Sequence, residues 1–283
     1  MQFGFALYDS VLDTERERDI GRLFEAGFTW IESQDPLSLI GRARFRRFAA
    51  FVARLQAQFR PSVSVHLPIT DLNPASENRA VRRLTLRQWR DGIRFAGDLG
   101  AVMVLMHPGH LGPVDLPARS DPGFERARLE AEQAKNRVWP YLLDAVHSCN
   151  ELAKGYGMAL VVENVIAADD LISTPEEHAR LLDSVNDDNV GAALDVGHAE
   201  RAGCGWRRFW EGLGSRIRHI HLADNDGAAD WHWPLGQGRI DFAGLMHTLT
   251  ASGYSGALVM EIVADDWSAH VAGKALLQRL ARA

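Results

Sequence analysis

The strongest constraint on the fold is an alternation between short apolar runs and longer segments of helical periodicity. Eight runs are rich in apolar residues, and most are almost continuously apolar. Such runs are typical of parallel strands that are covered on both faces, whereas a strand with one face in water alternates between apolar and polar residues. The runs are FGFALY (3–8), FTWIES (28–33), SVSVHLP (62–68), AVMVLMHPG (101–109), MALVVENV (158–165), VGAALDVGHA (190–199), IRHIHLADN (217–225) and GALVMEIV (256–263).

The segments between these runs complete a repeating strand–helix pattern. Eight such units without a linker rich in Pro, Gly or Ser predict an α/β fold, a single (β/α)₈ TIM barrel over residues 1–283. A doubly wound open sheet is the alternative. It normally has fewer strands, and its first turn is often a glycine-rich phosphate loop, which LYDSVLD (7–13) is not, so we expect no nucleotide cofactor. Helices are predicted at 14–25, 39–58, 77–99, 123–156, 175–185, 206–213, 242–251 and 267–282.

Composition narrows the class of protein. A hydrophobic content of 46% with 24% charged residues is typical of a globular enzyme, and the net charge of −6 argues against binding nucleic acid through bulk charge. Cys149 and Cys204 give neither a disulfide framework nor a CxxC motif. With no signal peptide and no apolar run of membrane-spanning length, we expect a cytoplasmic protein without membrane contacts. Barrels often pair, and the sequence leaves a homo-oligomer open.

Ionisable side chains stand at the C-terminal ends of six consecutive predicted strands, the third to the eighth. In a parallel barrel these ends lie on one rim, where the loops form the active site. A single histidine or carboxylate there is often a hydrogen-bonded structural residue or a helix cap. An ionised group at the edge of a core, however, needs a partner or a metal, and six strands in a row share the feature. The residues are His66, His107, Glu163, Asp195 with His198, His221 and Glu261.

The loop after the seventh run, DNDGAADWHWPLGQGRID (224–241), adds two further candidates. Asp230 and His232 are one residue apart, and in an extended segment such side chains point to the same side. Both are therefore expected to face the rim. Whether they bind a metal or a substrate is left open by the sequence.

The candidate ligands favour a divalent cation. Two glutamates, an aspartate and a histidine make a mostly oxygen site that suits Mn²⁺, Mg²⁺ or Co²⁺ and tolerates Zn²⁺. The further histidines and the Asp230–His232 pair exceed what one ion holds and would suit a cluster of zinc or manganese ions.

Several motifs together resemble the xylose isomerase-like barrel superfamily, which includes sugar isomerases and epimerases, inosose-processing enzymes and the endonuclease IV class. The resemblance covers most of the chain, especially the third to eighth strands. The motifs are VHLP (65–68), MHPGH (106–110), VVENV (161–165), LDVGHA (194–199), HIHLADN (219–225), DWHWPLGQGRID (230–241) and MEI (260–262).

In the isomerase and epimerase branch, the resemblance implies a single divalent metal. The two glutamates would also act as acid and base on opposite sides of the sugar, and the metal would stabilise an enediolate. The first hypothesis is therefore a metal-dependent isomerase or epimerase that acts on a sugar, sugar phosphate or cyclitol. The implied metal ligands are Glu163, Asp195, His221 and Glu261, and His198 is similar to a family residue that contacts the substrate. Trp231, whose indole suits a sugar face, is a further candidate substrate contact. Arg239 is another, in place of the arginine that sugar epimerases often carry in the loop after the seventh strand.

In the endonuclease IV branch, the resemblance implies three zinc ions that hydrolyse a phosphodiester. The alternative hypothesis is such a multi-zinc hydrolase, although the acidic net charge and the absence of a basic, aromatic wedge loop argue against DNA as its substrate. A binding module without chemistry is a third reading, and the two glutamates at strand ends argue against it. The additional ligands are matched by His66, His107, His198, Asp230 and His232.

Overall fold

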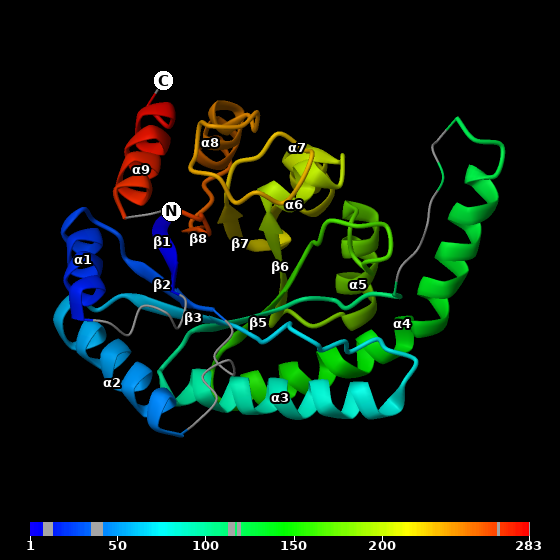
Figure 1. The fold of residues 1–283 in the computed structure, drawn as a ribbon, viewed down its shortest axis with the longest axis horizontal. Coiled ribbons are helices and arrows are strands. Elements are labelled where there is room, and N and C mark those ends of the chain that lie inside the picture. Colours follow the sequence, from blue (N-terminus) through cyan, green and yellow to red (C-terminus); the bar gives the residue numbers. More distant parts are fainter. Residues whose placement is uncertain (8–13, 35–41, 113–116, 118–119, 265–266, 283) are drawn as a thin grey trace.

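The structure is a computed structural model that describes residues 1–7, 14–34, 42–112, 117, 120–264 and 267–282. Its strands form a closed parallel barrel in which each strand pairs with the next in the chain, and the eighth pairs with the first (Figure 1). The predicted TIM barrel is confirmed. The strands are β1 (Gln2–Leu7), β2 (Trp30–Ser33), β3 (Ser62–His66), β4 (Met103–Met106), β5 (Ala159–Glu163), β6 (Val190–Asp195), β7 (Ile217–Leu222) and β8 (Ala257–Met260).

Helices surround the barrel, and the long α4 extends beyond the others (Figure 1). None of the helices in the described part of the chain is long and apolar enough to cross a lipid bilayer. The helices are α1 (Thr14–Glu25), α2 (Arg42–Phe59), α3 (Arg79–Asp98), α4 (Phe124–Gly155), α5 (Pro175–Val185), α6 (Val196–Arg201), α7 (Gly205–Leu213), α8 (Phe242–Ala251) and α9 (Ser268–Leu280), with a short 3₁₀ turn, η2 (Gly214–Arg216).

Local signals explain the boundaries of several helices. Helix α5 begins with a capping box, in which the Thr174 side chain accepts from the Glu177 N–H and Glu177 accepts from the Thr174 N–H. The run at 190–199 spans two elements, because the strand ends at Asp195 and α6 begins at the next residue. Asp195 caps this short helix, whose first residues Val196 and Gly197 continue the apolar run.

The two-residue period of the strands separates two cores. Outward side chains such as Phe5, Val104 and Leu160 pack with the helices in the large core. Inward side chains form a second apolar cluster, in which Trp30, Leu105, Val161, Ala193 and Val259 take part. Two residues further along each of these five chain segments, the inward positions become polar, and they are Glu32, His107, Glu163, Asp195 and Glu261.

The inward cluster leaves no room for a side chain at Gly4 of β1. A Cβ atom there would lie 2.9 Å from Trp30 Cβ and 2.9 Å from Val259 Cγ2. Glycine therefore lets the Trp30 indole fill the barrel beneath the polar layer.

Gly4→Ala is expected to destabilise the protein by about 1–3 kcal/mol, because an over-packed core must shift its backbone or side chains. The denaturant midpoint of unfolding measures this loss. Gly155→Ala at the end of α4 is the matched control, since a Cβ there meets nothing within 4 Å. Equal midpoints for the two variants would contradict the packing argument.

Candidate metal centre

Polar side chains at the C-terminal end of the barrel form three adjoining groups. Within each group, one potential ligand atom per residue lies within 4.8 Å of the others. These groups are consistent with divalent metal binding. We call them the first group (His66, His107 and Glu163), the central group (Glu163, Asp195, His221 and Glu261) and the outer group (His198, Asp230 and His232).

Glu163 belongs to two groups, and each of its oxygens serves a different one. Its Oε2 lies 3.3 Å from His66 Nε2 and 3.2 Å from His107 Nε2. Its Oε1 lies 2.9 Å from His221 Nδ1 in the central group. Glu163 could therefore supply one oxygen to a cation in each of the two groups.

Asp195 supplies the test of whether a cation fits. Its Oδ1 accepts a hydrogen bond from the His198 N–H at 2.6 Å, and the Asn164 amide holds its backbone N–H and carbonyl. Its Oδ2 is buried and has no hydrogen-bond partner within the described part of the chain. A buried carboxylate oxygen needs compensation, and this one lies 3.8 Å from His221 Nδ1, so a cation in the central group would supply it.

Four histidines of the groups each have one ring nitrogen fixed by an acceptor outside their group. That nitrogen must donate a proton, so the other nitrogen is the one that can present a lone pair to a cation once any proton it carries is released. Metal-binding histidines are held in the same manner. The acceptors are the carbonyl of Leu67 for His66 (2.8 Å), the carbonyl of Asn164 for His198 (2.9 Å), the carbonyl of Glu261 for His232 (2.6 Å) and Oε1 of Glu32 for His221 (2.7 Å).

The outer group is formed across the loop after β7. Asp230 Oδ2 lies 3.4 Å from His198 Nε2 and 3.1 Å from His232 Nε2. The prediction of an extended segment is wrong, because His232 has a left-handed backbone with φ of 49°. The His232 ring is turned inward instead by its hydrogen bond to the Glu261 carbonyl.

Electrostatics of the groups follow from burial and mutual proximity. Burial alone would lower the pKa of His221, but the carboxylates of Glu163, Glu32 and Glu261 raise it well above its usual value. Burial would also lower the pKa of His232, but the nearby carboxylates of Asp230 and Glu261 outweigh this effect and raise the pKa to about 9. The pKa of Glu163 lies well below its ordinary value despite burial, because His221 and His107 stabilise its charge.

Two predicted substrate contacts lie outside the three groups. Trp231 is exposed, stacks on Trp233 with 5.6 Å between ring centroids, and donates from Nε1 to Asp226. Arg239 donates from Nε to Glu200 Oε1 at 2.7 Å. Their roles in substrate binding stay predictions, as does that of His198.

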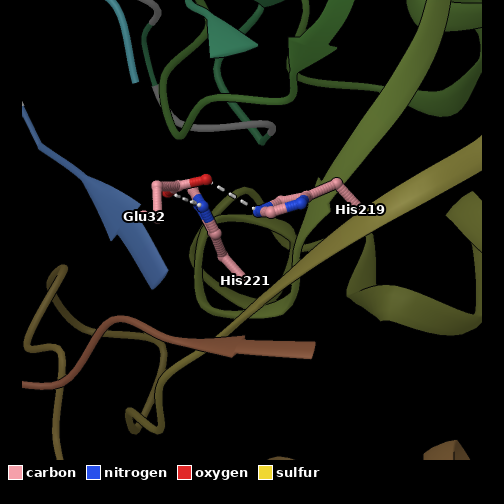
Figure 2. Close-up of side chains that lie close together, drawn as sticks. All are labelled: Glu32, His219 and His221. Atoms are coloured by element: carbon pink, nitrogen blue, oxygen red, sulfur yellow. Dashed lines mark hydrogen bonds and ion pairs between the residues drawn. The ribbon is translucent and has the colours of Figure 1, made fainter. Parts of the chain in front are cut away.

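Two buried residues were missed by the sequence reasoning. Glu32 and His219 lie in the barrel interior, and with His221 they form a further set beneath the central group (Figure 2). The signal was present, because Glu32 interrupts the apolar run FTWIES and is therefore a seventh strand-end carboxylate or histidine. It was overlooked because the rim pattern was read only from the third strand onward.

Comparison with known proteins agrees with this geometry. The model of a family described as Xylose isomerase-like TIM barrel matches residues 20–282. A solved D-tagatose 3-epimerase-like protein is 26% identical, with a TM-score of 0.77 and coverage of 100% of this chain and 97% of that one. The TTHB071 protein from Thermus thermophilus, solved after soaking with ZnCl₂, is also 26% identical, with a TM-score of 0.74 and coverage of 100% and 98%.

Another relative is named as a nuclease. A probable endonuclease 4 from Mycobacterium ulcerans is 33% identical over 201 residues, which are 67% of this chain and 68% of that protein. Alignments with three other curated relatives span only 60 to 68% of those proteins' lengths.

Zinc affinity is expected to rise with pH between 6 and 9. The raised pKa values of His221 and His232 keep protons on these rings in the metal-free protein, and a cation must displace them. Affinity should rise about tenfold per pH unit for each displaced proton. Calorimetric titration in two buffers of different ionisation enthalpy measures the protons released, and a pH-independent affinity without proton release would contradict the expectation.

Proposed function

Because this chain belongs to the xylose isomerase-like TIM barrel family, we propose that it is a hydrolase that cleaves a phosphodiester of a sugar-like small molecule at a cluster of divalent cations. The observation that carries the proposal is the division of Glu163 between the first and central groups, with the outer group beside them. The likeness to the probable endonuclease 4 supports it.

The three groups have the chemistry that phosphate ester hydrolysis requires. Zn²⁺ or Mn²⁺ ions held there would activate water and neutralise phosphate charge. The chain's part is to hold the ligand atoms in position: the Asn164 amide holds the Asp195 backbone, and backbone carbonyls orient three of the imidazoles. A small substrate is favoured over a nucleic acid because a net charge of −6 gives no bulk attraction to a polyanion.

The second candidate is the metal-dependent isomerase or epimerase. Glu163 Oε1 and Glu261 Oε2 lie 2.9 and 3.1 Å from His221 Nδ1, so two carboxylates approach one ligand position in the central group. The likeness to the D-tagatose 3-epimerase-like protein supports this reading. Against it, Glu163 Oε2 already lies between two imidazoles, which leaves that carboxylate poorly placed to accept and return a substrate proton.

We expect the zinc- or manganese-loaded protein to hydrolyse bis(p-nitrophenyl) phosphate and to bind more than one ion per chain. Release of p-nitrophenolate and elemental analysis measure the two properties. A protein that holds one ion at saturation and leaves the diester intact, while it exchanges a sugar proton with solvent, would favour the isomerase and contradict the proposal.

His66→Asn and His232→Asn are expected to lower the rate of hydrolysis by about 100-fold or more, because each removes a ligand from a group that a hydrolase needs. An isomerase needs only the central group, so its proton exchange would survive both changes. His147→Asn, at an exposed position of α4, is the matched control and should leave the rate unchanged. Full hydrolysis by both ligand variants would contradict the role of the first and outer groups.

A further inference from the structure

The set beneath the central group consists of Glu32 on β2 and of His219 and His221 on β7 (Figure 2). These strands are not neighbours, since β1 and β8 separate them in the barrel order. Glu32 therefore reaches His221 through the interior. The residue of β1 in register with Glu32 is Ala6, whose side chain is small.

Glu32 is completely buried, and polar side chains surround both of its oxygens. Gln34 Nε2 donates to Oε1 at 3.1 Å, and His221 Nε2 lies 2.7 Å from the same atom. Ser64 Oγ donates to Oε2 at 2.7 Å, and His219 Nε2 lies 3.0 Å from that atom. Three hydrogen bonds therefore reach the carboxylate, while His219 Nε2 lies close to Oε2 without the geometry of a hydrogen bond.

These three hydrogen bonds argue against a fourth cation between Glu32, His219 and His221. A carboxylate oxygen that binds a cation uses a lone pair, and three of the four lone pairs of Glu32 already face hydrogen-bond donors. Ser64 is itself fixed, because it accepts from Trp30 Nε1 at 2.8 Å. The set is built to hold the carboxylate still.

The hydrogen bond from His221 Nε2 to Glu32 determines what the other ring nitrogen, Nδ1, can do. Glu32 can only accept, so His221 Nε2 carries the proton and Nδ1 is left to face Glu163 and Glu261. We infer that Glu32 is a positioning residue that fixes the tautomer and orientation of His221 for a cation in the central group. The inference rests on the proposed metal centre and is independent of which reaction that centre performs.

The acceptor that holds His221 can be changed by mutation, because it is a side chain. His66, His198 and His232 are oriented by backbone carbonyls, which no side-chain change removes, whereas His221 depends on a side chain. Loss of such a partner typically lowers metal affinity by about 10- to 100-fold.

The test compares Co²⁺ binding by the wild-type protein, Glu32→Gln, His219→Asn and the control Glu176→Gln. Glu176 is an exposed glutamate that pairs with Arg208 and belongs to none of the three groups. Chelator competition gives the affinity of each ion, and elemental analysis gives their number. Glu32→Gln should lower the affinity for one ion by about 10- to 100-fold without changing the number of ions bound at saturation. The control should match the wild type in both properties.

A spectroscopic measurement separates positioning from a general structural effect. In the zinc-loaded wild-type protein, ¹H–¹⁵N NMR should show a slowly exchanging proton on His221 Nε2, and Glu32→Gln should shift it or speed its exchange. Ser64→Ala, which removes one donor to Glu32, is the second variant if Glu32→Gln does not fold. It should weaken the binding of the same ion by less than Glu32→Gln does, because Glu32 itself remains.

Three outcomes would overturn the inference. Unchanged affinity in both Glu32→Gln and Ser64→Ala would show that Glu32 does not position the ligand. Loss of the same single ion at saturation from both Glu32→Gln and His219→Asn would show that these residues bind a cation themselves. Absence of Co²⁺ binding by the wild-type protein would contradict the proposed metal centre and, with it, this inference.

Discussion

The rest of the site depends on the contacts of the buried Glu163 carboxylate with three histidines. It has almost no contact with water, so its charge must be met by the protein or by a bound cation. The structure meets it from two sides, with His66 and His107 at one oxygen and His221 at the other. Every other member of the first and central groups is placed around this one side chain.

The barrel provides this arrangement through the period of its strands. The apolar inward cluster that contains Trp30 and Val161 fills the lower interior, and the next inward position of the same chain segments is ionisable. Burial in this layer makes each unpaired charge costly, and the residues respond with fixed hydrogen bonds. Four of the histidines are consequently oriented before any cation arrives, with one ring nitrogen held by an acceptor and the other facing the groups.

The fold and the convergence of the candidate ligand residues could be predicted because both follow from local patterns. Continuous apolar runs mark buried parallel strands, and the strand ends mark the rim. Glu32 and the conformation of His232 could not be obtained in the same way. The contact between Glu32 and His221 crosses a closed barrel between strands 189 residues apart, and the left-handed backbone of His232 depends on a tertiary hydrogen bond to the Glu261 carbonyl. The number of cations depends on such tertiary distances.

Anomalous X-ray diffraction from crystals soaked with Mn²⁺ or Zn²⁺ tests the central claim most directly. Separate ions are expected in the first and central groups, each bound by a different oxygen of Glu163, and a further ion is expected between His198, Asp230 and His232. A single ion in the central group, with His66 and His107 still bonded to an unshared Glu163 oxygen, would contradict the central claim.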